Sequence, residues 1–145
     1  MERKSECIFL LVAIVVGFAP VAEAADFKVV VHASNPISSA TAKEVSGFFL
    51  KKNLTWPDGQ EVTAVDLGPD SPIRMEFSAA IHGKKVSSVK SYWQRQIFQG
   101  KTVPPMEEST ETEVVLFVGS NPGAIGYVSS SFSLGTHVKE LAVKD

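Results

Sequence analysis

The residues from Asn121 to Val128 read Asn-Pro-Gly-Ala-Ile-Gly-Tyr-Val, and this octapeptide decides the fold. Asn-Pro-Gly predicts a turn, because proline fixes its own φ and Gly123 can take the positive φ that closes the turn. The following Ala-Ile-Gly-Tyr-Val predicts a short buried strand, in which Gly126 leaves room for another backbone or a ligand. We interpret the octapeptide as a helix-to-strand corner of an α/β sheet, the kind of place where α/β proteins bind ligands.

Helices and strands alternate along the rest of the chain, which predicts the α/β class. Apolar β-branched runs indicate strands, and Ser or Thr residues ahead of apolar helical faces indicate helix starts. We expect a mixed β-sheet flanked by helices, in one domain over residues 25–145. The expected strands are 27–33, 61–67, 124–128 and 138–143, and the expected helices begin at Thr41, Ser71, Ser87 or Ser88, and Ser109 or Thr110.

The first 24 residues have the pattern of a cleavable signal peptide. A basic start precedes an apolar run at residues 8–19, and Ala22-Glu23-Ala24 fits a cleavage site. The apolar run is shorter than the roughly 20 residues that a membrane span needs. We therefore expect cleavage before Ala25 and no stable membrane insertion afterwards. The lone Cys7 lies in this segment, and export without cysteines is typical of a bacterial periplasm.

Composition and motifs argue against several classes of function. No Lys/Arg block interleaves with aromatic residues, so we expect no nucleic-acid partner. His32, His82 and His137 have no metal-ligand spacing, and no Gly-x-Ser-x-Gly elbow is present. We interpret Glu107-Glu108 and the Glu111/Glu113 pair as acids that stabilise a helix start, not as a catalytic pair. The sequence therefore predicts a non-enzyme without cofactor or metal.

The larger aromatic residues are open to two interpretations. They could form a stacking surface for a ligand, or they could pack in the core. The helical spacing of most of them favours core packing. The residues concerned are Phe48, Phe49, Trp56, Trp93 and Phe98.

The candidate ligand site is Ser71-Pro72-Ile73-Arg74. It follows an expected strand and opens an expected helix, so free N–H groups and the positive end of the helix dipole would face outward. The Ser71 hydroxyl, the Ile73 amide and the Arg74 guanidinium could together hold an oxyanion. Alternatively, Ser71 only caps its helix while Arg74 pairs with an acid. Asp66 and Asp70 favour this alternative, because both bring negative charge to the same corner.

A series of motifs between Val29 and Val143 points to one family. In chain order they are Asn35-Pro36, Phe48-Phe49-Leu50-Lys51 ahead of Trp56-Pro57-Asp58-Gly59, Ser71 with Arg74 and Phe77, Tyr92-Trp93, Phe98-Gln99-Gly100-Lys101 with Pro104-Pro105, and the octapeptide. Together they resemble the phosphate-type substrate-binding proteins of ABC importers, which are class II periplasmic binding proteins. The chain is most similar to small, single-lobe members.

The resemblance implies a periplasmic binding protein whose ligand is phosphate or a related oxyanion and whose partner is an importer permease or another envelope protein. The chain departs from the family, however. The family has two lobes and, in this one, an arginine followed by a Ser-Gly-Thr turn. Here Pro72 and Ile73 replace the glycine and threonine, and Leu67 or a neighbour stands in the place of the arginine. We expect weak phosphate binding, if any, through Ser71, Ile73 and Arg74. The alternative is a protein-interaction or dimerisation module derived from one lobe, which leaves a homo-oligomer open.

Overall fold

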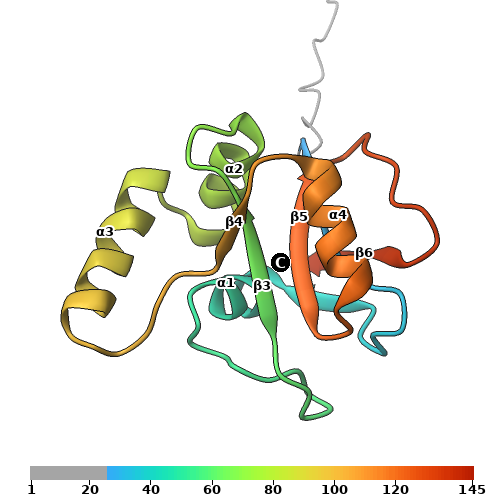
Figure 1. Cartoon of the computed structure of the whole chain (residues 1–145), viewed down its shortest axis with the longest axis horizontal. Coiled ribbons are helices and arrows are strands. Elements are labelled where there is room, and N and C mark those ends of the chain that lie inside the picture. Colours follow the sequence, from blue (N-terminus) through green and yellow to red (C-terminus); the bar gives the residue numbers. More distant parts are fainter. Residues whose placement is uncertain (1–25) are drawn as a thin grey trace, which may run out of the picture.

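The computed structural model describes residues 26–145, so the expected signal peptide and its cleavage site lie outside the described residues. Residues 26–145 form a six-stranded mixed sheet in the order β2-β6-β1-β5-β3-β4 (Figure 1). The expected α/β class, a mixed sheet flanked by helices, is confirmed. The strands are β1 (Phe27–His32), β2 (Ser39–Thr41), β3 (Thr63–Leu67), β4 (Met106–Glu108), β5 (Ala124–Ser129) and β6 (Val138–Lys144). The helices are α1 (Ala42–Phe49), α2 (Pro72–Phe77), which continues into the π-helical η1 (Ser78–His82), α3 (Val86–Phe98) and α4 (Glu111–Ser120).

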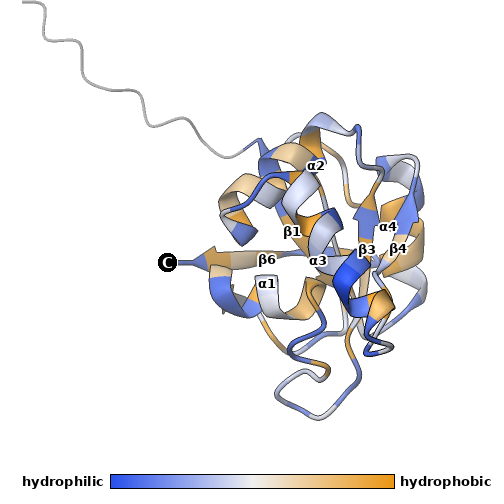
Figure 2. Ribbon diagram, turned by 90° about the vertical axis from the view of Figure 1, so that its left-hand side faces the viewer, coloured by the Kyte–Doolittle hydropathy of each residue, from blue (hydrophilic) through white to orange (hydrophobic). Residues whose placement is uncertain are grey.

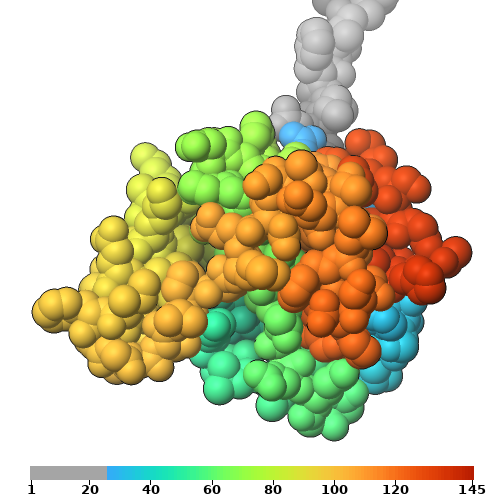
Figure 3. Space-filling model, in the orientation of Figure 1, coloured from blue at the N-terminus to red at the C-terminus, as the bar shows by residue number. Residues whose placement is uncertain are grey.

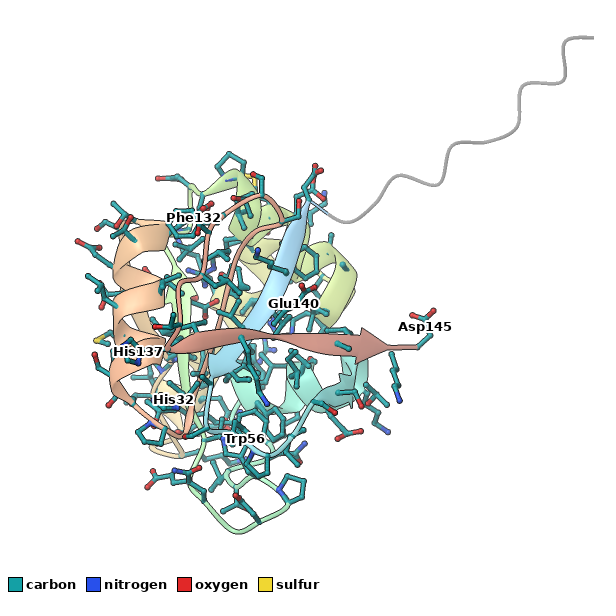
Figure 4. The ribbon with its side chains drawn as sticks, turned by 90° about the vertical axis from the view of Figure 1, so that its right-hand side faces the viewer. His32, Trp56, Phe132, His137, Glu140 and Asp145 are labelled. Carbon is teal, nitrogen blue, oxygen red and sulfur yellow. The ribbon has the colours of Figure 1, made fainter. Side chains whose placement is uncertain are left out.

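The strand β1 lies inside the sheet, antiparallel to both β5 and β6. On the far side of β5, β3 and β4 run parallel to it and to each other. Figure 4 shows β6 crossing the molecule from His137 to Asp145. The sequence did not predict β2 or β4, because a strand of three residues is too short to show a period.

Three of the predicted helix starts are confirmed, and one is wrong. Thr41 and Thr110 each make a capping box, and Ser71 caps α2 with Pro72 in its first turn. The helix α3 instead begins at Val86 after Lys85, which makes no side-chain cap, so neither Ser87 nor Ser88 is the N-cap. The Ser78 side chain and backbone make two hydrogen bonds with the backbone of Lys84. These bonds fix the turn directly ahead of Lys85, so the helix begins one or two residues earlier than the serines predict.

The octapeptide forms the predicted helix-to-strand corner, but its first glycine serves a different purpose from the one expected. The positive-φ glycines among the described residues are Gly59, Gly83, Gly100 and Gly135, so Gly123 does not close the turn with a positive φ. A Cβ on Gly123 would lie 2.2 Å from the carbonyl oxygen of Glu61. Its own carbonyl accepts hydrogen bonds from the indole of Trp56 and the amide of Thr63, both at 3.0 Å. Glycine is needed there because another backbone comes very close.

The second glycine of the corner makes room for a helix. A Cβ on Gly126 would lie 2.8 Å from Val114 of α4 and 3.0 Å from Val65 of β3. The neighbouring Tyr127 points to the opposite face and stacks on Phe77 of α2, with ring centroids 3.9 Å apart. The sheet is therefore covered by α4 on one face and by α1 and α2 on the other (Figure 1).

The helix α3 stands apart from this core (Figures 1 and 3). Its buried residues are Val89 and Trp93, which pack with Leu50 in a small separate cluster. Core packing is confirmed for Phe48, Phe49, Trp56 and Trp93. It is wrong for Phe98, which is 94% exposed. Helical spacing indicated a buried face, but no second element covers the end of α3.

Candidate ligand-binding corner

The predicted site lies where β3 ends and α2 begins. Ser71 has an extended backbone, and its hydroxyl oxygen accepts a hydrogen bond from the Arg74 amide at 3.3 Å. This is the geometry of an N-cap, which satisfies one of the free N–H groups of the first turn. Pro72 has no N–H, so Ile73 carries the remaining outward amide of that turn. Both Ser71 and Ile73 are half-buried.

The Arg74 side chain turns inward, and the residue is only 4% exposed. Its Nη1 donates to the Leu67 carbonyl at 2.9 Å and to the Glu107 carboxylate at 2.7 Å. Its Nη2 lies 3.9 Å from the Asp66 carboxylate. The guanidinium therefore faces the edge of the sheet, and acceptors of this chain already occupy it.

The strand register explains why an arginine is held there. Asp66 of β3 and Glu107 of β4 are directly paired in the parallel ladder, so both carboxylates fall near the same place. Burial raises the pKa of Asp66, and the positive charge of Arg74 opposes that effect. Burial alone would lower the pKa of Arg74, but Asp66 and Glu107 outweigh it and the pKa is raised. The arginine thus stays charged and compensates two neighbouring acids.

Tyr127 completes the buried network. Its hydroxyl donates to Asp66 Oδ1 at 2.7 Å and accepts from the Leu67 amide at 3.2 Å. The second bond matters because the β3–β5 ladder extends only through Thr63 and Ala64, so the Leu67 amide needs another acceptor. Burial, followed by the Asp66 carboxylate, raises the pKa of Tyr127, which keeps the phenol protonated. Tyr127 is a structural joint between β5 and β3.

Taken together, the corner sets the carboxyl groups of Asp66 and Glu107 against one guanidinium. Of the predicted site residues, Ser71 and Ile73 lie together at its surface, whereas Arg74 lies behind them. Sequence reasoning missed Glu107 as a member of this corner, because the acid was interpreted as a helix-start residue. The only signal for it was the pairing of β4 with β3, which a three-residue strand does not reveal.

Residues 26–145 contain no group of three or more His, Cys, Asp or Glu side chains that could hold a metal ion. No helix in that range is long and apolar enough to cross a membrane. Pairing of β1 with β6 brings His32 close to His137 (Figure 4), while His82 lies apart at the end of η1.

Solved structures of phosphate-type binding proteins share this fold, and one of them contains bound phosphate. A protein from Clostridium perfringens, assigned to the phosphate ABC transporter substrate-binding proteins and solved with bound phosphate, has a TM-score of 0.64 and 19% identity over 81% of this chain and 44% of its own. A possible phosphate binding protein from Planctomyces limnophilus has a TM-score of 0.62 and 16% identity, over 83% of this chain and 42% of its own. An ABC-type phosphate transport receptor from Vibrio cholerae has a TM-score of 0.56 and 15% identity, over 81% of this chain and 46% of its own.

The chain has the fold of one lobe of a phosphate-type substrate-binding protein. It spans less than half the length of each of these solved structures. No family model matches the sequence, and no curated protein matches it either. The lobe-like fold expected from the sequence motifs is therefore confirmed, and the neighbours are substrate-binding proteins rather than enzymes.

Proposed function

We propose that this protein is an exported, periplasmic, non-catalytic binding-protein-like lobe that binds phosphate or a related oxyanion only weakly, at a Kd of about 1 mM or higher. The observation that carries the proposal is the fold of residues 26–145, shared with one lobe of a phosphate-bound protein. An importer permease or another envelope protein would be its partner. Residues 1–24 would be removed as a signal peptide on export, leaving a domain of residues 25–145 that resembles one lobe of a periplasmic binding protein.

The anion contact would come from the surface of the Ser71–Arg74 corner. The Ser71 hydroxyl can still donate its proton while its oxygen caps the helix, and the Ile73 amide points out of the same turn. Arg74 contributes its charge from behind, because its Nη1 is shared between Leu67 and Glu107. Two neutral donors in front of an arginine that is already hydrogen-bonded support weak binding, since a free arginine fork would be needed for a strong phosphate contact.

Replacing Arg74 itself would be a poor test. Removing one partner of a buried charge cluster typically costs about 3–5 kcal/mol, so loss of binding could reflect unfolding. The matched pair Ser71→Asn and Ser71→Asp avoids this problem, because both residues are good N-caps. Only the aspartate places a negative charge where the oxyanion would sit.

Isothermal calorimetry with inorganic phosphate, at millimolar concentrations, measures the outcome. We expect the wild type and Ser71→Asn to give weak heats of similar affinity, and Ser71→Asp to give none. Unchanged binding in Ser71→Asp would place the anion elsewhere. Absence of heat for phosphate and sulfate in the wild type would remove the oxyanion function altogether.

A protein-interaction or dimerisation module is the second candidate, and one surface feature favours it. A groove of about 660 Å³ is lined by apolar side chains, among them Phe48, Val62 and Phe117, together with polar ones such as Lys51 and Asn53. Leu54 and Met106, which also line the groove, are 61% and 48% exposed. Light scattering after size exclusion would detect a dimer, and Leu54→Asp should dissociate it. A monomer at every concentration tested, with no envelope partner recovered, would count against this function.

A further inference from the structure

The segment from Lys84 to Lys101 carries all its charge with one sign. It contains Lys84, Lys85, Lys90, Arg95 and Lys101 and no acidic residue. In the sequence these cations are too scattered to form a basic block. In the structure they are gathered on and around α3, and we call residues 84–101 the basic arm. The rest of the chain is therefore acidic on balance, since the formal net charge of the whole is −2.

The basic arm projects from the body of the molecule (Figures 1 and 3). On one side of α3, Val89 and Trp93 are buried. Hydrophilic colours dominate the exposed side of the helix (Figure 2). At the end of the helix, however, the side chains of Ile97 and Phe98 are 54% and 94% exposed. Two adjacent exposed apolar side chains at the end of a projecting basic helix form the combination found in helices that bind at a membrane interface.

The five cations of the basic arm have no ion-pair partner among residues 26–145. Over residues 26–145, both ion pairs within 4.0 Å belong to Arg74. In the most acidic stretch, residues 107–113, three of the four carboxylates already have partners among residues 26–145. Glu107 is paired with Arg74, Glu111 accepts from Ser129, and Glu113 closes the cap of α4. The exposed cations of the arm are therefore free to contact negative charge from outside the protein.

We propose that the basic arm docks this protein onto the surface of an anionic phospholipid bilayer. Exposed cations around the helix would meet the headgroups, while Ile97 and Phe98 enter the boundary between headgroups and acyl chains. A convex tip with cations on both flanks suits a fluid surface, whereas a protein partner would need a groove that encloses it. The site is separate from the Ser71–Arg74 corner, and its occupancy does not depend on phosphate.

Sedimentation with lipid vesicles tests the proposal. The protein is purified after expression of the full sequence, and mass spectrometry identifies its N-terminal residue. All variants share that N-terminus, so any contribution of residues 1–25 is common to them. We expect binding to phosphatidylglycerol-containing vesicles and little binding to pure phosphatidylcholine. Binding should fall sharply between about 50 mM and 500 mM salt, because the Debye length shortens to a few ångströms.

Two matched pairs of variants locate the contact. The double substitution Lys90→Gln/Arg95→Gln should weaken binding about 25-fold, at roughly fivefold per cation. Its control, Lys43→Gln/Lys144→Gln, changes the net charge equally at exposed positions of α1 and β6 and should change binding by less than about threefold. Phe98→Ser should weaken binding about tenfold or more, whereas Leu116→Ser, at a 64% exposed leucine of α4, should not.

Each outcome decides the proposal. Equal binding to neutral and anionic vesicles, or equal losses in the arm and control variants, would overturn it. A dimer that dissociates on Phe98→Ser, with no protein recovered on vesicles, would assign the arm to a second copy instead. Circular dichroism of every variant checks that the substitutions, all at exposed positions, leave the fold intact.

Discussion

Acidification should destabilise this protein through one half-buried histidine. His82 ends η1, and its Nδ1 shares a 2.7 Å hydrogen bond with the Ser46 hydroxyl of α1. Its ring lies edge-on to Phe77 at 5.5 Å between centroids. Burial, then the positive charges of Lys84, Arg74 and Lys52, lower the pKa of His82 from 6.5 to about 4. The folded state therefore holds this side chain neutral over a pH range in which the unfolded chain charges it.

The sign and size of the effect follow from that difference. Above pH 6.5 both states are neutral, so His82 imposes no penalty. As the pH falls from 6.5 to about 4, the unfolded state takes up the proton first and stability is lost. At about 1.4 kcal/mol per pKa unit, the complete loss is about 3 kcal/mol. For a domain of this size such a loss lowers the melting temperature by roughly 10 °C.

The assay is urea unfolding at pH 7 and at pH 4, in the wild type and in His82→Gln. Glutamine can still bond to Ser46 but does not titrate. The wild type should lose about 3 kcal/mol more than the variant between the two pH values. Carboxylates such as Asp66 titrate in both proteins and cancel in this difference. Equal losses in the two proteins, or an NMR titration that places the His82 pKa near 6.5, would refute the reasoning.

Two further substitutions test the corner that joins α4 to the sheet. Gly123→Ala should destabilise the fold by about 3 kcal/mol or more, because the new Cβ would lie 2.2 Å from the Glu61 carbonyl oxygen. Its control is Gly68→Ala, where a Cβ meets nothing within 4 Å, and this change should cost about 1 kcal/mol or less. Similar midpoints in urea for the two alanine variants would disprove the crowding. Tyr127→Phe should cost about 1–3 kcal/mol, because the buried Asp66 loses the donor at 2.7 Å. A thermal melt indistinguishable from wild type would show that this hydroxyl is dispensable.

The relation to phosphate-binding proteins is structural, and the corner explains why the ligand chemistry does not follow directly. Ser71 caps the start of α2, and Arg74 is part of a buried network with Asp66, Glu107 and Tyr127. An arginine used in this way stabilises the edge of the sheet. The residues left at the surface, Ser71 and Ile73, are neutral donors, and the proposed weak binding rests on them.

Local features were predictable from the sequence because each depends on neighbouring residues. The capping boxes at Thr41 and Thr110, the Ser71–Pro72 helix start and the buried strand after Gly123 all follow from hydrogen bonds or steric limits within a few positions. Together with the order of the motifs, they were enough for the α/β class and for the likeness to one lobe of a binding protein.

Other features were decided by segments that are far apart in the sequence. Glu61 crowds Gly123 across 62 positions, and Glu107 reaches Arg74 across 33. Phe98 shares the helical spacing of a core residue, yet nothing packs on it. Local chemistry thus determined where each helix and strand begins and what this chain resembles. Only the tertiary structure decided which charges meet, which glycines are crowded and which aromatic side chain stays in water, because each of these depends on the surface that another element brings near.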